Sequence, residues 1–265
     1  MLLFGLTLLS KHSFAELNLV KNQAIQDLRG NIDRALKTCT IRRQADKWYA
    51  CFSCEVEPKP LPKSKKAVGI DVGLERFATL STKEKIDNPH FFKTDQKALA
   101  KVQRKLSKQE KGSPERVKAR KVVARIHERI ANRRNNFCHQ EAKKLVDRFG
   151  VICIEDLSIN KMKENNFRSI NKNIGDVAWG QFAQYLSYKA ESADRTLVRV
   201  NLAYTSQTCS NCGYKQVKKL SDRVYHCSCC GFETSRDHNS ALNILALGTQ
   251  SLGISHRSPI QSLIG

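Results

Sequence analysis

The sequence predicts an α/β domain that is interrupted by a pair of basic helices and by a small cysteine-rich insert. Short apolar strands alternate with helical segments along most of the chain, which is the pattern of a sheet covered by helices. A long stretch rich in Lys and Arg separates two of the strands, and four cysteines in two C-x-x-C pairs precede the last helical segment. These three observations set the architecture that we expect.

The first 65 residues are predicted to form an N-terminal piece that ends in a linker. Apolar residues alternate with their neighbours from Trp48 to Cys54, which is the period of a β-strand. The stretch "PKPLPKSKK" then breaks this pattern with prolines and lysines. The opening run "MLLFGLTLLS" is the one targeting candidate, but it is short and lacks a preceding basic region, so it fits a secretory signal poorly.

Three stretches are predicted to supply the strands of the α/β domain. "KAVGIDVGLERFATLS" holds two apolar runs around a four-residue turn, which indicates a β-hairpin. "FGVICIEDLSI" is a continuous apolar strand of the buried kind, and "TLVRVNLAY" is a further strand. Helices are expected over "VAWGQFAQYLSYKAESA", with Trp179, Phe182, Tyr185 and Leu186 as its core face, and over "DHNSALNILALG".

A basic helical hairpin is predicted between Lys93 and Arg148. Apolar residues recur there at helical spacing, "KGSP" interrupts them, and Ser113 followed by Pro114 is a helix start signal. The stretch holds 18 Lys or Arg against 6 Asp or Glu, which is net +12 of the chain's +21. A solvated helix face is the alternative, but too few acidic residues interleave to neutralise this charge, so we expect phosphate contacts. The residues expected to make them are Arg125, Arg129, Arg133 and Arg134.

The cysteine-rich insert has the spacing of a four-thiolate zinc site. Cys209 and Cys212 form one C-x-x-C pair, and Cys227 and Cys230 form another after fourteen intervening residues. A glycine follows each pair, where a knuckle that aims two sulfurs at one ion often needs φ > 0. These glycines favour Cys230 over Cys229 as the fourth ligand, and they leave His226 less favoured. Unrelated cysteines or two disulfides are the alternatives.

Three carboxylates are predicted to share one edge of the sheet, namely Asp71 and Glu155 at strand ends and Asp237 at the start of the last helix. Three carboxylates so close together repel one another unless cations neutralise them, and hard oxygen ligands suit Mg²⁺ or Mn²⁺. A pair of these ions activates a water and steadies the leaving oxygen in phosphodiester cleavage. Each carboxylate also has a structural alternative. Asp71 could start a turn, Glu155 or its neighbour Asp156 could cap the segment after the strand, and Asp237 could be a helix N-cap.

Composition indicates a nucleic-acid-binding protein in a reducing compartment. The 46 basic residues exceed the 25 acidic ones by far more than solubility requires, which is typical of a polyanionic partner. The ten cysteines do not form the dense framework of a small secreted domain. No apolar run is long enough to span a membrane, so we expect a soluble protein, cytoplasmic and nucleoid-associated, with no membrane partner.

Four stretches resemble successive motifs of the TnpB (OrfB) proteins, which bacterial insertion elements encode and which are related to the compact type V CRISPR nucleases. In chain order they are "GIDVGLERFATLS", "ICIEDLSI", "AYTSQTCSNCGY" and "SRDHNSALNIL". The resemblance runs from about Trp48 to Gly248. It implies a RuvC-type RNase H-like domain that is interrupted by a zinc ribbon, with Asp71, Glu155 and Asp237 as metal ligands.

The resemblance also implies a division of the chain. Members of the family carry a larger N-terminal region, which residues 1–46 resemble only weakly, so we expect an N-terminally shortened copy. The implied parts are a remnant of the wedge and recognition region with its linker (1–65), the nuclease domain (66–203) with its basic insert (about 93–148), the zinc ribbon (204–234), the final helix (235–248) and a C-terminal tail (249–265).

The implied activity is RNA-guided cleavage of DNA, with DNA and a guide RNA as partners, Zn²⁺ as a structural metal and Mg²⁺ or Mn²⁺ as catalytic metals. A reading from another class stays open, namely a non-cleaving nucleic-acid-binding remnant or a regulator of transposition, which would keep the basic helices and the ribbon. A transposase that joins DNA strands uses similar carboxylate chemistry. It is less favoured, because the resemblance points to guided cleavage.

Overall fold

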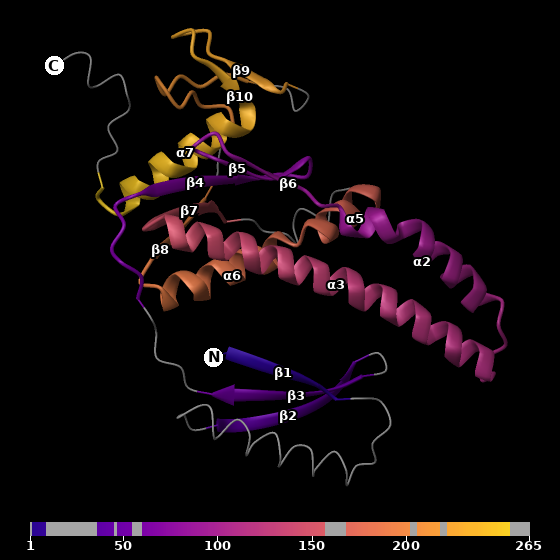
Figure 1. The fold of residues 1–265 in the computed structure, drawn as a ribbon. Helices are drawn as coiled ribbons and strands as arrows, with labels where there is room; N and C mark the ends of the chain where they lie inside the picture. The colour runs from indigo at the N-terminus through magenta and orange to yellow at the C-terminus, as the bar shows by residue number, and fades with distance from the viewer. Residues whose placement is uncertain are drawn as a thin grey trace. The chain divides into compact units, whose positions relative to one another are not determined.

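The computed structural model describes residues 2–8, 36–44, 47–54, 60–156, 168–201, 206–217 and 222–254. The elements, drawn in Figure 1, are β1 (Leu2–Leu8), β2 (Leu36–Gln44), β3 (Lys47–Cys54), β4 (Ala67–Val72), β5 (Arg76–Leu80), β6 (Lys85–Asp87), α2 (Phe91–Ser107), α3 (Pro114–Arg148), β7 (Val151–Glu155), α5 (Arg168–Val177), α6 (Trp179–Ser192), β8 (Thr196–Val200), β9 (Val224–His226), β10 (Glu233–Ser235) and α7 (Arg236–Ser251). They divide into two compact units, Met1–Pro58 with Asp95–Ala131 and Lys59–Thr94 with Asn132–Gly265. Among the described residues, no helix has the length and apolar character needed to cross a bilayer.

The first unit contains a three-stranded antiparallel sheet in the order β1-β3-β2. The strand predicted from Trp48 to Cys54 is confirmed as β3. The opening apolar run, which the sequence offered only as a targeting candidate, contains β1, and all seven of its residues pair with β3. The Tyr49 hydroxyl donates to a carboxylate oxygen of Glu128 on α3 at 2.7 Å, which attaches the sheet to that helix.

The basic helical hairpin is confirmed as α2 and α3. α3 begins at Pro114, and the Ser113 hydroxyl accepts the backbone N–H of Arg116 at 3.2 Å, as the start signal predicted. The Arg116 guanidinium donates to the carbonyl oxygens of Leu106 and Gln109 at 3.0 and 2.8 Å. These bonds tie the first turn of α3 to the last turn of α2 and to the segment after it, and they close the turn between the helices.

The second unit is built on a five-stranded mixed sheet in the order β6-β5-β4-β7-β8. β4, β5 and β6 are antiparallel neighbours, whereas β4, β7 and β8 run parallel. The predicted hairpin (β4 and β5), the buried strand (β7) and the later strand (β8) are all confirmed. The strand order reverses at β4, since β5 and β6 lie on one side of it and β7 and β8 on the other, and open α/β sheets hold ligands at such a position.

The C-terminal half of α3 and helix α6 cover one face of this sheet. Their residues share one apolar core with the strands, and the ring of Phe77 on β5 meets those of Phe137 and Phe182 edge-on at 4.8 and 5.0 Å. The predicted core face of α6 is buried except at Tyr185, which is half-buried. Tyr185 lies at the rim because its hydroxyl bonds to Asn135 of α3.

The predicted final helix, α7, covers the other face. Two glycines let it approach the strands closely. A Cβ on Gly69 of β4 would overlap the carbonyl oxygen of Ala241, and a Cβ on Gly248 would overlap the sulfur of Cys153 on β7. The sheet is thus enclosed between α7 and the pair formed by α3 and α6, and its strand ends are held at fixed positions against α7.

Candidate metal centres

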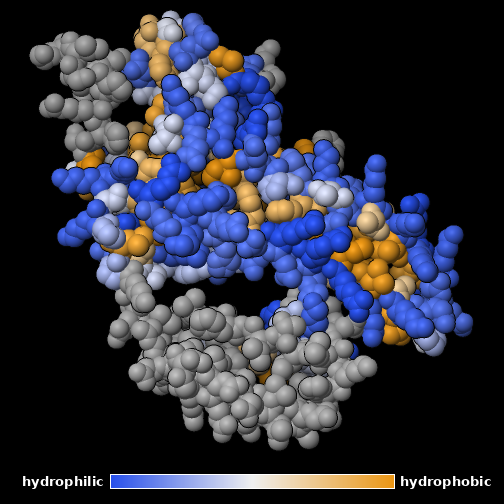
Figure 2. All heavy atoms as spheres, in the orientation of Figure 1, coloured by the Kyte–Doolittle hydropathy of each residue, from blue (hydrophilic) through white to orange (hydrophobic). Residues whose placement is uncertain are grey.

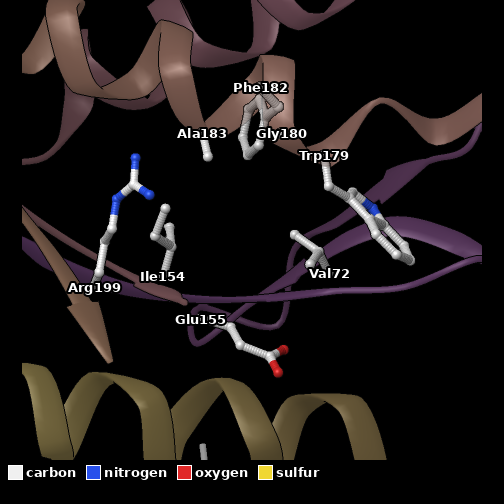
Figure 3. Close-up of a pocket in the computed structure, with 8 residues that line it drawn as sticks. All are labelled: Val72, Ile154, Glu155, Trp179, Gly180, Phe182, Ala183 and Arg199. Carbon is white, nitrogen blue, oxygen red and sulfur yellow. The ribbon is translucent and has the colours of Figure 1, made fainter. Parts of the chain in front are cut away.

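The ends of β4 and β7 bring Asp71 and Glu155 next to each other. These strands are parallel neighbours, and the residues just before this pair are matched in register. Side chains alternate between the two faces of a strand, so both carboxylates share a face with Gly69 and Cys153, two residues earlier. Those residues contact α7, so the carboxylates lie on the face that α7 covers. Figure 3 shows the Glu155 carboxylate on the α7 side of the sheet, whereas Trp179 and Phe182 of α6 line an apolar pocket on the other side.

Asp237 reaches the same edge from the first turn of α7. The N-cap of this helix is Ser235, whose side chain accepts a backbone N–H of the first turn at 3.3 Å. This excludes the alternative that Asp237 is itself the N-cap. Ala241, one turn after Asp237, packs on Gly69 of β4. Asp237 therefore lies one turn closer to the strand end that carries Asp71.

The electrostatics show that Asp71 is affected by both of the other carboxylates. Burial raises the pKa of Asp71 well above its ordinary value, and repulsion from Asp237 and Glu155 raises it further. Burial also raises the pKa of Glu155. Arg236 opposes the shift in Asp71, and its Nε lies 3.7 Å from Asp237 Oδ1. Negative charge is thus concentrated at an edge with little solvent, which a bound cation would stabilise.

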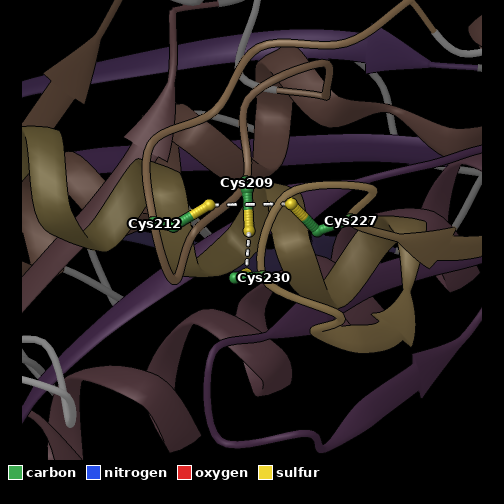
Figure 4. A group of neighbouring side chains, drawn as sticks. All are labelled: Cys209, Cys212, Cys227 and Cys230. Carbon is green, nitrogen blue, oxygen red and sulfur yellow. Dashed lines mark hydrogen bonds between the residues drawn. The ribbon is translucent and has the colours of Figure 1, made fainter.

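The four predicted cysteines form a compact group, and their sulfurs lie within 4.8 Å of one another (Figure 4). Cys209 Sγ is 3.8 Å from Cys230 Sγ, and Cys212 Sγ is 3.6 Å from Cys227 Sγ. A tetrahedral zinc ion with Zn–S bonds of about 2.3 Å needs S···S separations of about 3.8 Å, so the donor set fits. In the described ranges this is the single group of three or more potential ligands gathered so closely. The carboxylates repel one another but do not form such a group.

The two knuckles have the backbone geometry that the sequence predicts. Gly213 and Gly231 adopt φ of +76° and +69°, in the left-handed region. Their backbone N–H groups donate to the carbonyl oxygens of Cys209 and Cys227 at 2.9 and 3.0 Å, so each glycine closes its turn. Cys229 is exposed and lies outside the group, as the glycine register predicted. None of the four grouped cysteines is in a disulfide, which excludes that alternative.

The four thiols differ in acidity, since burial raises the pKa of Cys209 whereas that of Cys230 is lowered, and the segment has little core of its own. A backbone hydrogen bond from Phe232 and the side-chain amide of Asn211 lower the pKa of the Cys230 thiol to about 6. Apart from two of the cysteines, the buried apolar residue of this cluster is Tyr225, with Phe232 partly buried against it. The alternative ligand His226 is exposed on β9 and is not in the group. So small a core is typical of segments that a bound metal stabilises.

Three of the four predicted phosphate-binding arginines are exposed on α3, whereas Arg134 is only half-exposed. Figure 2 shows hydrophilic side chains over most of the visible described surface, apart from scattered apolar patches. Such a surface agrees with the basic composition of α2 and α3, because charged residues line the solvent-facing sides of both helices.

Arg134 and Arg129 are each paired with a carboxylate. Arg134 donates through Nε and Nη2 to a carboxylate oxygen of Asp176 at 2.9 and 2.6 Å. The same carboxylate accepts the backbone N–H of Phe92 at the start of α2, so this pair holds α2, α3 and α5 together. Arg129 pairs with Asp95 across the hairpin. We therefore expect Arg134 in particular to contribute more to stability than to phosphate binding.

Sequence reasoning missed Arg236, Asn239 and Asn243, which lie in the same helix as Asp237. Asn239 is fully buried and Asn243 nearly so, and both bond to the backbone of the first knuckle. The available signal was the run of five polar residues, 236–240, at the start of a helix that is mostly apolar beyond it.

Comparison with known families agrees with this organisation. Residues 51–166 match the OrfB_IS605 family, described as "Probable transposase". Residues 179–244 match the Cas12f1-like TNB domain. The first match covers β4 to β7 with the basic hairpin, and the second covers α6 to the first half of α7 with all four cysteines. The chain is thus similar to the OrfB_IS605 family in its first part and to a Cas12f1-like TNB domain in its second.

Individual relatives extend the match across most of the chain. A protein of Streptomyces pristinaespiralis, named as a candidate RNA-guided DNA endonuclease, is 39% identical over 214 residues, 80% of this chain and 52% of that protein. InsQ of Escherichia coli (strain K12), named in the same way, is 32% identical over 228 residues, 80% of this chain and 57% of InsQ. The resemblance to the TnpB (OrfB) family that the four motifs indicated is confirmed. The chain spans about half the length of these relatives.

A solved structure gives the same result at the level of fold. The cryo-EM structure of a CRISPR-Cas12f ternary complex matches with a TM-score of 0.55 at 20% sequence identity, over 85% of this chain and 48% of that chain. At this identity the likeness supports the fold alone. The mixed α/β sheet is therefore shared with that nuclease, while the chemistry of the carboxylates has to be argued from this chain's own residues.

Proposed function

We propose that this chain performs RNA-guided, divalent-metal-dependent cleavage of DNA for a bacterial insertion element, and that its second unit is a RuvC-type RNase H-like domain. The observation that carries the proposal is the placement of Asp71 beside Glu155, with Asp237 of α7 reaching the same edge. The sheet order, in which three antiparallel strands are followed by two parallel ones, supports this fold type. The names of the relatives support the substrate and the guide.

Asp71, Glu155 and Asp237 would hold Mg²⁺ or Mn²⁺, because hard carboxylate oxygens suit these ions and the raised pKa of Asp71 shows how strongly the edge favours added positive charge. When bound, such ions activate a water and offset charge on the leaving oxygen of a phosphodiester. The residues of this chain fix the carboxylates on two adjacent strands and a packed helix, so their positions are set before nucleic acid arrives. Arg236 would hold part of the negative charge between binding events.

Cys209, Cys212, Cys227 and Cys230 would hold a structural Zn²⁺, with all four positions taken by thiolates and none open for chemistry. The exposed arginines of α3, Arg125, Arg129 and Arg133, would contact phosphates of DNA or guide RNA. In this proposal the chain is divided as the resemblance implies, with the basic hairpin and the ribbon as inserts in the nuclease domain. Both inserts would bind nucleic acid.

Cleavage can be tested with the purified full chain, Mg²⁺ or Mn²⁺, and two substrates: single-stranded DNA, and duplex DNA supplied with RNA copurified from the native locus. Wild-type protein should cut, and Asp71→Ala should reduce the rate to background, because one ligand in a charged cluster is removed. Glu155→Gln should do the same. The matched control is Asp156→Asn, which removes an exposed carboxylate one residue further on, 3.8 Å from Arg199, and should leave cleavage unchanged.

Each result separates the candidate functions. Cleavage that persists in Asp71→Ala refutes the assignment of the carboxylates. No cleavage by either protein, together with tight binding by both, favours a non-cleaving binding remnant or regulator. Strand joining in place of hydrolysis would indicate a transposase.

A further inference from the structure

Asn239 clamps the first cysteine knuckle to helix α7. Its side-chain oxygen accepts the backbone N–H of Ser210 at 2.9 Å, and its side-chain nitrogen donates to the carbonyl oxygen of Thr208 at 2.8 Å. These two residues flank Cys209, a member of the sulfur group. One amide thus pairs with the main chain on both sides of a predicted zinc ligand.

This clamp is fully enclosed. Asn239 has 0% exposure, and a buried amide is costly unless both of its ends are hydrogen-bonded. Asn243, one turn later on α7, donates to the same Thr208 carbonyl at 2.8 Å. The helix therefore holds the knuckle at two points one turn apart. Any displacement of the knuckle would leave buried polar groups on α7 without partners.

The same turn of α7 carries the carboxylate centre. Asp237 lies two residues before Asn239, and His238 between them is also fixed. Its Nε2 donates to the Ser81 carbonyl at 3.1 Å, and its Nδ1 accepts from the Thr234 hydroxyl at 2.8 Å. Burial lowers the pKa of His238, which agrees with the neutral ring that this pairing needs. Three consecutive residues thus join the carboxylate edge, the turn after β5 and the cysteine knuckle.

We propose that Asn239 is a positioning residue that couples the two metal centres: occupation of the four-cysteine site fixes the knuckle, the knuckle fixes the first turn of α7 through Asn239, and that turn places Asp237 for divalent-ion binding. The proposal rests on the function proposed above, because it takes the carboxylates to be a divalent-ion site. By thermodynamic reciprocity, ions at the carboxylates must in turn raise the affinity of the cysteines for zinc by the same factor.

The test measures binding, not cleavage. Mn²⁺ affinity is determined by electron paramagnetic resonance on zinc-loaded and zinc-depleted full-length protein, and only binding that Asp71→Asn abolishes is counted. Zinc-loaded wild type should bind Mn²⁺ at least about fivefold more tightly than zinc-depleted wild type, which is the lower end of ordinary allosteric coupling. Asn239→Leu has nearly the same side-chain shape but no hydrogen bonds. With zinc present, it should bind Mn²⁺ as weakly as zinc-depleted wild type, and zinc removal should change its affinity little.

The control is Asn243→Leu, which removes a bond to the same carbonyl but leaves both hydrogen bonds of Asn239 in place and should retain most of the coupling. A merely structural role for Asn239 would lower Mn²⁺ affinity by the same factor with and without zinc, and that additive result overturns the proposal. If Asn239→Leu and Asn243→Leu lose the coupling between zinc and Mn²⁺ binding equally, the coupling belongs to the helix as a whole, and the specific role of Asn239 is overturned.

A second readout separates this proposal from the function on which it rests. If wild type shows no Mn²⁺ binding that depends on Asp71, the carboxylate assignment fails, and amide hydrogen exchange across residues 238–244 then tests the clamp alone. Zinc depletion should speed exchange there at least about tenfold in wild type and much less in Asn239→Leu, because the variant already lacks the connection. Exchange that does not respond to zinc in wild type would show that the knuckle does not hold the helix.

Discussion

The two candidate metal centres of this chain are built in opposite ways. The cysteine group draws its four ligands from two short knuckles within 22 residues, each closed by its own glycine and its own backbone hydrogen bond. The carboxylate centre draws its three residues from two strands and a helix that are far apart in the sequence. Nothing in the local sequence around Asp71 or Glu155 fixes where the other lies. Only the parallel register of β4 and β7 does so.

The difference also sets how each centre responds to the loss of a metal. The cysteine-bearing segment has one large buried residue besides two of the cysteines, so we expect an ion to be required for its folding. The carboxylates sit on strands and a helix whose apolar cores are complete without them. Burial and repulsion raise the pKa of Asp71, so we expect this carboxylate to destabilise the metal-free protein. We therefore expect metal to be required for folding at the cysteines and to relieve an unfavourable charge at the carboxylates.

The largest effect is expected at the cysteine group. Cys230→Ser should lose about one zinc per chain and unfold the knuckles, because a closed four-thiolate site cannot keep its geometry with three sulfurs. Cys229→Ser should keep the zinc, since its side chain lies outside the group. Metal analysis of the two purified variants gives the answer. If zinc is lost from Cys229→Ser and kept in Cys230→Ser, then Cys229 and not Cys230 is the fourth ligand.

At the carboxylates, in contrast, a substitution is expected to stabilise the metal-free protein. Asp71→Asn should raise the melting temperature of the metal-free protein by a few degrees, because it removes a buried charge and two repulsions. In wild type the folded-state pKa of Asp71 is above its unfolded value of 3.8, so the contribution of Asp71 to stability is greatest below pH 3.8 and falls as the pH rises from there through the folded-state pKa. This fall should shrink in Asp71→Asn, as should the stabilisation by added Mg²⁺ or Mn²⁺.

Thermal melts at several pH values, with and without the divalent ion, measure both effects. Asp156→Asn again serves as the exposed control and should change neither. A metal-free Asp71→Asn protein that is less stable than wild type would mean that this carboxylate makes favourable contacts, and it would remove the contrast with the cysteine group.

The smallest effect is expected on the basic helix, where each charge contributes separately. Arg125→Gln together with Arg133→Gln should weaken binding to DNA or RNA and reduce the slope of log affinity against log salt, by up to about 0.9 for each phosphate that the variant no longer neutralises. Arg134→Gln should mainly lower the melting temperature, since it leaves the enclosed Asp176 carboxylate without its cation. An unchanged slope in the double variant contradicts phosphate binding at these positions.

Features whose cause is local could be predicted from the sequence alone. The glycine after each cysteine pair correctly indicated which sulfurs gather, because a tight knuckle needs positive φ at that residue. Ser113 and Pro114 placed the start of α3 correctly, because capping depends on neighbours within one turn. The strands β3, β4, β5, β7 and β8 followed from their apolar patterns. In contrast, the opening run of the chain is equally apolar and did not reveal a strand, since its pairing partner lies about 40 residues away.

Which polar side chains work together was settled by tertiary contacts. Four arginines on α3 looked equivalent in the sequence, but Arg134 pairs with Asp176, which comes from a helix that the sequence pattern did not predict. In the sequence, Asn239 does not differ from an ordinary polar helix residue. Its role depends on the packing of α7 against both the sheet and the first knuckle. Strand register, helix packing and ion pairing depend on contacts between distant segments. A pattern of neighbouring residues can indicate which groups are able to meet, and the packed core then selects those that do.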